Sequence, residues 1–171
     1  AVVGSGNLGG IWFPRLDGRQ TVGQIETAYP GLLAGMVAHP GISFVTVMAD
    51  AGPVAIGVGG SIDLRTGAVT GENPLDDFGP HAQGDLLRIA EFSNAPDVYL
   101  NSLYDASTDE VAAFEELVGC HGGLGGWQTQ PMIVHPSGWA VDDDLTDQQG
   151  QLHGAPNVYR QFVRWLEQQG H

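Results

Sequence analysis

The chain has 171 residues, of which 42% are hydrophobic and 15% charged, and its six Arg against twenty acidic residues give a formal net charge of -14. A chain of this length buries roughly 70% of its unfolded surface and needs no disulfide or metal ion to fold. The negative charge repels phosphate backbones, so we expect no direct binding to nucleic acid. No apolar stretch approaches the ~18 residues of a membrane-spanning helix, and the first residues lack the pattern of a secretory signal.

The glycine-rich segment at residues 4–9 fits the G-x-G-x-x-G pattern of dinucleotide-binding loops. That pattern requires a helix directly after it, whereas Ile11, Trp12 and Phe13 before Pro14 predict an extended segment. We therefore favour a glycine-bearing strand here, with a nucleotide-binding loop as the alternative.

Helix and strand patterns follow each other over the next fifty residues. Thr21 and Gln24 form a capping box that predicts a helix start, and Pro30-Gly31 interrupts this helix. Two β-branched runs at residues 42–48 and 53–58, separated by a turn, predict a hairpin.

The second half of the chain is richer in turns. Residues 65–80 predict a surface loop with one short strand, and an apolar face over residues 86–92 predicts a helix. A strand at residues 97–101 is expected to turn into residues 110–114 as a second hairpin. We further expect a short buried strand at residues 131–134 and a C-terminal helix with an apolar stripe made of Val158, Phe162, Val163, Trp165 and Leu166. Residues 1–171 are thus predicted to form a single α/β unit, a mixed sheet with hairpins and a C-terminal helix.

The segment least like ordinary core or loop is residues 115–126, where His121 stands among five glycines. Glycines let a backbone turn tightly and approach an ion or ligand closely. A neutral imidazole on such a loop can bind a metal through one ring nitrogen while the other nitrogen donates a hydrogen bond. Because zinc normally needs three or four protein ligands, spacing alone favours a histidine that is only hydrogen-bonded in a turn.

Other potential ligands do not have metal-site spacing. No histidine pair stands four residues apart on a predicted helix, and Asp142-Asp143-Asp144 does not continue into a calcium loop. Cys120 and His121 are consecutive and point to opposite faces of an extended segment, so they cannot act as nucleophile and base. We interpret the following residues as structural or solvated: His39, His81, Glu115, Glu116, Cys120, His135, Asp142 to Asp144, and His153.

One longer pattern resembles a known family. The runs Asn101-Ser102-Leu103-Tyr104-Asp105, residues 110–119 and residues 121–126, followed by Gln128-Thr129 and Pro131, are similar to the C-terminal part of actinobacterial type I phosphodiesterase/nucleotide pyrophosphatase-like proteins. These proteins belong to the alkaline phosphatase superfamily, and members with a membrane-spanning N-terminal region often carry a phage-holin label. The resemblance implies the C-terminal portion of an alkaline-phosphatase-like α/β/α fold.

The resemblance also implies a chemistry. His121 matches the last metal-ligating histidine of a site for two divalent ions, usually zinc, and the implied substrate is a small phosphate ester. Two cations clamp the attacking and leaving oxygens of an in-line displacement at phosphorus. The family's nucleophile, its first aspartate ligand and its Asp-His-Gly segment are absent from these 171 residues, and Cys120 stands where a small residue such as serine is expected.

These observations lead to two hypotheses. In the first, the chain is the C-terminal portion of a divalent-metal-dependent phosphoric ester hydrolase, is inactive alone, and is completed by an upstream part of the same protein or by a partner chain. In the second, it is a non-enzymatic α/β binding or assembly module. The first hypothesis predicts a cytoplasmic location or attachment to a membrane through an N-terminal region that this sequence does not contain.

Overall fold

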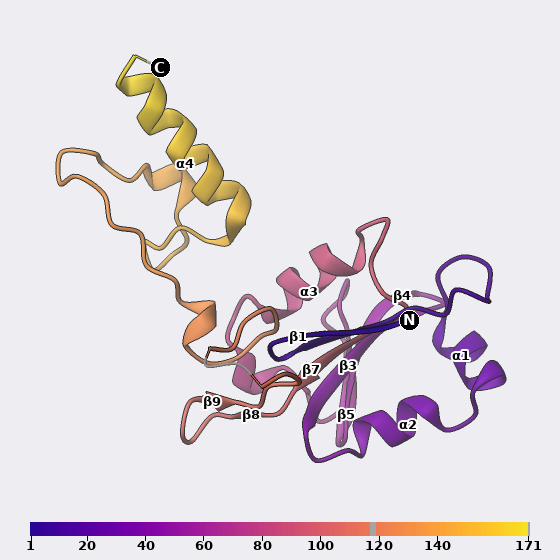
Figure 1. Ribbon diagram of the computed structural model, residues 1–171. Coiled ribbons are helices and arrows are strands. Elements are labelled where there is room, and N and C mark those ends of the chain that lie inside the picture. Colours follow the sequence, from indigo (N-terminus) through magenta and orange to yellow (C-terminus); the bar gives the residue numbers. More distant parts are fainter. Residues whose placement is uncertain (117–118, 171) are drawn as a thin grey trace. The chain divides into compact units, whose positions relative to one another are not determined.

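The computed structural model describes residues 1–116 and 119–170, and these form two compact units, Ala1–Pro131 and Met132–His171. The first unit is a mixed α/β structure built on a large antiparallel sheet, and the second contains the C-terminal helix (Figure 1). The single α/β unit that the sequence predicted over residues 1–171 stays a prediction.

The sheet of the first unit has seven strands, and every neighbouring pair is antiparallel, so the prediction of a mixed sheet is wrong. Strands β1 and β2 are neighbours in the sheet and consecutive in the sequence, and so are strands β3 to β6. Strand β7 comes last of these strands in the sequence but lies between β2 and β3 in the sheet. In spatial order the strands are β1 (Val2–Ser5), β2 (Leu8–Ile11), β7 (Val98–Ser102), β3 (Ile42–Ala49), β4 (Gly52–Gly57), β5 (Gly60–Asp63) and β6 (Val69–Gly71).

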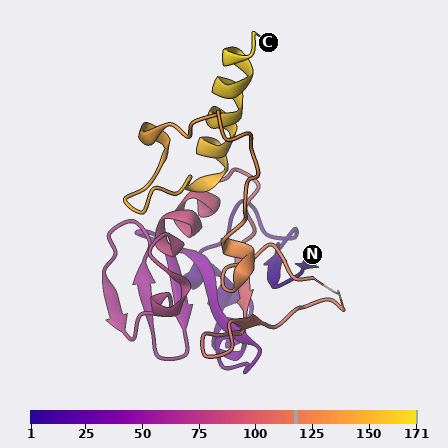
Figure 2. The same cartoon turned by 90° about the vertical axis from the view of Figure 1, so that its left-hand side faces the viewer.

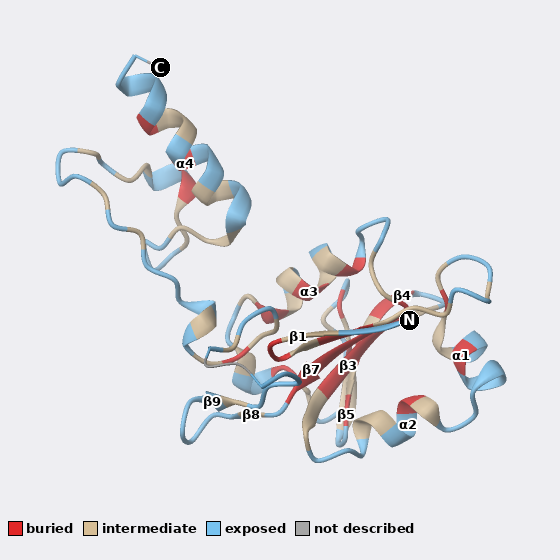
Figure 3. Ribbon diagram, in the orientation of Figure 1, coloured by how far each residue is buried: buried red, intermediate tan, exposed pale blue. Residues whose placement is uncertain are grey.

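Helices cover both faces of this sheet (Figure 1, Figure 2). Helices α1 (Val22–Ala28) and α2 (Leu32–Val37) pack on one face, and α3 (Ala82–Ala90) packs on the other. Because successive side chains of a strand point to opposite faces, Phe44 joins the core under α3 while Val45 and Val47 join the core under α1 and α2. The buried residues of this unit are concentrated on the central strands (Figure 3).

Local sequence signals account for most of these elements. Thr21 accepts a hydrogen bond from Gln24 N, and the Gln24 side chain accepts one from Thr21 N, which confirms the capping box that starts α1. Gly31 has a φ of +77° between α1 and α2, which confirms the predicted interruption. The hairpin predicted from residues 42–58 is β3–β4.

The glycine-rich segment at residues 4–9 forms the β1–β2 hairpin, so the predicted strand is confirmed. The next helix begins only at Val22, and a dinucleotide-binding loop requires a helix directly after its glycines. The nucleotide-binding alternative therefore lacks its structural context.

The second predicted hairpin is wrong in its pairing. The strand at residues 97–101 exists as β7, but all five of its residues are buried and its two edges pair with β2 and β3. No edge of β7 is left for residues 110–114. A small separate hairpin forms instead from β8 (Tyr104–Asp105) and β9 (Glu110–Val111).

The sequence missed one strand and predicted one that is absent. Strand β5 was not predicted, because it is only four residues long and starts at Gly60. The short strand expected within residues 65–80 is confirmed as β6. The buried strand expected at residues 131–134 is wrong: these residues form no regular structure, and Met132 and Val134 are 87% and 89% exposed. The described residues also form three single-turn 3-10 helices: η1 (Asp76–Phe78), η2 (Trp127–Thr129) and η3 (Asp143–Leu145).

The second unit is organised around one helix, α4 (Gly154–Gln168), as the sequence predicted. Of the expected apolar stripe only Trp165 is buried, while Phe162 and Leu166 are 43% and 51% exposed. The Trp165 ring stacks on His135 with a centroid distance of 4.8 Å, and its Nε1 donates to Ala140 O at 2.7 Å. The residues before α4 therefore fold back onto this single tryptophan.

Candidate functional site

The histidine singled out by the sequence lies beside the β1–β2 turn. Its side chain is exposed, whereas its backbone is held, because Asn7 N donates to His121 O at 3.2 Å. Gly6 in this turn has a φ of +58°, and a Cβ at this position would come within 2.0 Å of His121 O. Only glycine fits between the hairpin and the histidine backbone.

The side chain of Asn7 holds the next part of the loop. Asn7 is fully buried, and its Oδ1 accepts hydrogen bonds from Gly123 N at 2.8 Å and from Gln128 Nε2 at 3.0 Å. Its Nδ2 donates to Leu124 O at 2.9 Å. One buried amide thus binds two consecutive residues of the glycine loop and a side chain beyond it.

A second buried amide reaches the same loop from β7. Asn101 is also fully buried, and its Oδ1 accepts from Leu124 N at 2.7 Å while its Nδ2 donates to Leu124 O at 3.1 Å. A Cβ on Gly123 would lie 2.6 Å from Asn101 Oδ1 and 2.8 Å from Asn7 Cγ, so a side chain there would separate the loop from both amides. Buried polar groups are normally hydrogen-bonded, and the backbone of Gly123 and Leu124 provides partners for both asparagine side chains.

Two more side chains complete the anchorage. Tyr99 Oη donates to Gly122 O at 3.3 Å, and burial raises the pKa of this tyrosine to about 12 because the phenolate form would be desolvated. Glu115 Oε2 accepts a hydrogen bond from Gly6 N at 3.3 Å. The carbonyl of His121 and the backbone of residues 122–124 after it are therefore tied to the sheet and the β1–β2 turn, while His121 itself is exposed.

The other candidate ligands do not gather around His121. In the second unit, His135 stacks on Trp165, and Asp142 and Asp144 bind Arg164 with oxygen–nitrogen distances of 3.1 Å and 2.7 Å. Within residues 1–116 and 119–170, no group of three or more His, Cys, Asp or Glu side chains is placed to hold a metal ion. Among the described residues, His121 is thus a single possible ligand and not part of a complete metal centre.

The remaining candidates have structural positions. His39 Nδ1 accepts a hydrogen bond from Gly41 N at 3.0 Å within the turn after α2, as the turn interpretation predicted. His81 and His153 directly precede α3 and α4. Cys120 is a free, half-buried thiol next to His121. Glu116, which was interpreted as solvated, is exposed.

Sequence reasoning missed the residues that hold the loop. The sequence analysis assigned no role to Asn7, Tyr99, Asn101 or Gln128, although they make most of the loop's side-chain hydrogen bonds. One signal was available: Asn101 directly follows the apolar run Val98-Tyr99-Leu100 in a predicted strand, and an amide that is buried in a strand needs a hydrogen-bond partner.

Comparisons with known proteins do not extend these observations. No protein-family model matches the chain, and searches of curated proteins and of solved structures found no match. The resemblance to type I phosphodiesterase-like proteins therefore stays a prediction from the sequence. Among the residues that the structure describes, no helix has the length and apolar character needed to cross a membrane.

Proposed function

We propose that this chain is the C-terminal portion of a divalent-metal-dependent phosphoric ester hydrolase of the phosphodiesterase/nucleotide pyrophosphatase type, with the alkaline-phosphatase-like fold. In this proposal His121 is one metal ligand, and the remaining ligands and the nucleophile come from an upstream part of the same protein or from a partner chain. Two bound divalent ions, zinc in most such enzymes, would neutralise the charge that develops on the phosphoryl oxygens.

One observation carries the proposal: an exposed imidazole sits on a loop whose backbone is fixed by two fully buried asparagines from different parts of the sheet. A histidine that only fills a surface turn does not need this support, because a turn satisfies its own backbone groups locally. A metal ligand does need it, since ligand atoms must be held within a fraction of an ångström of the productive geometry.

The charge of the chain agrees with a metal-dependent reaction. With a net charge of -14, the protein repels a free phosphate ester. Bound divalent cations invert the local charge and allow an anionic substrate to approach. In the proposed role this chain's residues position a neutral imidazole nitrogen, and the groups that react at phosphorus belong to the upstream part of the protein or to the partner chain.

The layers of the first unit are compatible with the proposed fold. Helices α1 and α2 cover one face of the sheet and α3 covers the other, which is an α/β/α arrangement. The loop with His121 joins the sheet at the β1–β2 turn, beside the edge strand β1. The other ligands of the proposed site would have to reach this corner of the sheet.

The test uses the complete protein in which this sequence occurs. We expect His121→Ala to lose bound zinc, measured by mass spectrometry of the metal content, and to lose hydrolysis of bis-p-nitrophenyl phosphate. His39→Ala is the matched control, because it removes an exposed turn histidine and should leave both quantities unchanged. Full metal content and full activity in His121→Ala would contradict the ligand assignment.

The alternative is a non-enzymatic α/β binding or assembly module. It is favoured by the observation that the described residues bring no second or third ligand to His121. This alternative predicts that the natural product binds no divalent metal and that its size in its native cells is 18 kDa. An immunoblot of the native protein, followed by the metal measurement on the purified band, separates the two functions.

A further inference from the structure

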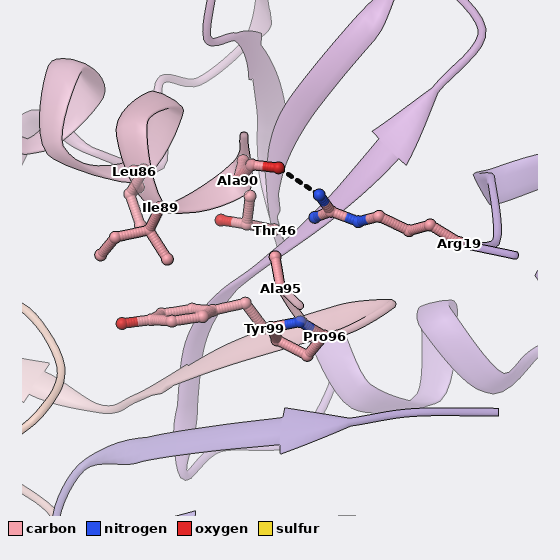
Figure 4. Close-up of a pocket in the computed structure, with 8 residues that line it drawn as sticks. All are labelled: Arg19, Thr46, Leu86, Ile89, Ala90, Ala95, Pro96 and Tyr99. Atoms are coloured by element: carbon pink, nitrogen blue, oxygen red, sulfur yellow. Dashed lines mark hydrogen bonds between the residues drawn. The ribbon is translucent and has the colours of Figure 1, made fainter. Parts of the chain in front are cut away.

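A pocket of about 360 Å³ opens in the first unit, at the end of the sheet where β3 begins and β7 ends. Its wall is formed by the end of α2 and the turn after it, the start of β3, the β4–β5 turn, and the segments at residues 73–78 and 103–104. Pockets that bind small molecules have volumes of roughly 300–1,000 Å³. The cavity under α3 that Figure 4 shows has a volume of about 10 Å³ and is too small for an organic molecule.

Contacts between distant parts of the chain fix the wall of this pocket. Tyr104 N donates to Ser43 Oγ at 3.0 Å, which ties the chain after β7 to the start of β3. A Cβ on Gly57 would lie 2.7 Å from Pro74 Cβ, so glycine at this position lets residues 73–78 lie against β4. The pocket is therefore formed without a ligand, and a formed pocket lowers the entropy cost of binding.

Much of the pocket surface is apolar and open to solvent. Val58, in the β4–β5 turn, is 84% exposed, and Leu103 is 44% exposed. Phe78 and Tyr104 form an aromatic pair in the same wall, with a distance of 5.3 Å between their ring centroids. An apolar group bound in the pocket would remove these side chains from water, which favours binding.

The charge of the pocket is negative. Among the described residues of its wall, Asp77 carries the formal charge, because Nδ1 of His39 accepts a hydrogen bond from Gly41 N and the imidazole is thus neutral. The pKa of Tyr104 is raised, chiefly because its hydroxyl donates a hydrogen bond to Asp109, and the charge of Asp77 adds to this effect. The field of the Asp77 carboxylate therefore reaches the aromatic pair.

We propose that this pocket binds a small organic amine in its cationic form, with the apolar body of the ligand against Val58 and Leu103 and its ammonium group near Asp77 and the aromatic pair. A carboxylate and the faces of aromatic rings both attract an ammonium group. The net charge of -14 also favours a cation over an anion. The inference does not depend on the proposed hydrolase function, because none of the described residues of the glycine loop lines the pocket.

Probes of similar shape and different charge test the proposal. Phenethylamine is a cation at neutral pH, phenethyl alcohol is neutral, and hydrocinnamate is an anion. We expect phenethylamine to shift the backbone amide NMR signals of Ser43, Val58, Asp77 and Tyr104 in the isotope-labelled chain, with a dissociation constant of about 1 mM. The alcohol should bind more weakly, and the anion should cause no shifts. Absence of these shifts with phenethylamine, or binding of the alcohol or the anion as tight as that of the cation, would overturn the proposal.

Asp77→Asn tests the role of the carboxylate at an exposed position outside the core. We expect the affinity for phenethylamine to fall roughly 2- to 5-fold, the effect of losing one exposed ion pair, and the affinity for phenethyl alcohol to stay the same. Asp50→Asn is the matched control, because it removes the same charge from the exposed turn between β3 and β4, at the other end of these strands. An unchanged affinity in Asp77→Asn, or an equal loss in both variants, would overturn the assignment of the ammonium site.

Discussion

Residues 119–131 of the first unit and residues 132–153 of the second are both long segments with little regular structure, but the balance of the interactions that hold them differs. The first segment is bound by neutral amides, because Asn7 and Asn101 lie buried against the sheet and bond to the backbone of Leu124. The second segment is bound by the aromatic ring of Trp165 and by ion pairs at the surface, and one buried amide, Gln161, accepts a hydrogen bond from Asp142 N at 2.8 Å.

The difference follows from what each segment packs on. A sheet covered on both faces provides a dry interior, where an amide exchanges two hydrogen bonds with a backbone and gains from the low dielectric constant. In the second segment the large ring of Trp165 supplies most of the apolar contact, and the charged groups of the Arg164–Asp144 pair stay partly exposed. The first segment is held through the backbone around an exposed imidazole, whereas His135 of the second segment is held through its ring, which stacks on Trp165.

The largest expected effect is in the second unit, where Trp165→Ala removes the ring on which the segment packs. Truncation of a buried tryptophan costs about 3 to 5 kcal/mol. A unit this small has little stability in reserve. We expect α4 to lose its protection from amide hydrogen exchange.

Tyr159→Ala is the control on the same helix, because this side chain is 69% exposed. Protection of α4 that survives Trp165→Ala would show that the second unit does not depend on its single ring, and the comparison between the two segments would fail.

Asn101→Ala is expected to have the next largest effect. It leaves Leu124 N without its acceptor and removes one of the two donors to Leu124 O, so we expect the free energy of unfolding to fall by about 2 to 4 kcal/mol. Urea denaturation measures this change. The loss should be the same at low and high salt because no ionised group is involved. Asn94→Ala, in an exposed loop, is the control and should leave the stability unchanged.

The importance of Asn101 was not predictable from the sequence, although much of its surroundings was. The apolar run at 97–101 correctly indicated a strand, and the capping box at Thr21 correctly placed the start of α1. These signals are local, because they depend on the period of side chains and on residues three positions apart.

Long-range pairing has no such signal. Asn7 and Gly123 are 116 positions apart, and no local pattern in either segment indicates that the two residues are in contact. For the same reason β7 was assigned to a hairpin with residues 110–114, although it pairs with β2 and β3. The sequence identified His121 as the unusual residue of its loop but could not identify the amides that hold it.

Tyr99 allows the first segment to be tested by pH. Its pKa is raised from 10.0 to about 12 by burial, so the unfolded chain releases the hydroxyl proton at a lower pH than the folded protein does. The stabilising contribution is therefore fully present below pH 10 and decreases as the pH rises toward 12, by about 2 to 3 kcal/mol at 1.36 kcal/mol per pH unit. Tyr99→Phe should unfold with a weaker pH dependence over this interval. An unchanged dependence would mean that Tyr99 is not buried against the loop.

The smallest expected effect concerns the ion pairs of the second segment. The Arg164 guanidinium donates hydrogen bonds to Asp144 and lowers the pKa of this exposed carboxyl below its ordinary value of 3.8. Because the folded-state pKa is lowered, the ion pair contributes stability above the unfolded pKa of 3.8, and this contribution is lost as the pH falls through the folded-state pKa. Because the pair is exposed, salt should weaken it as well. Hydrogen-exchange protection of α4 should thus decrease slightly in acid and in high salt, and Asp144→Asn should abolish that part of the decrease, whereas Asp143→Asn should not. If instead the salt dependence is found in the protection of residues 122–124 and not in α4, then charge holds the first segment, and the distinction between a loop fixed by buried amides and a loop fixed at a surface is wrong.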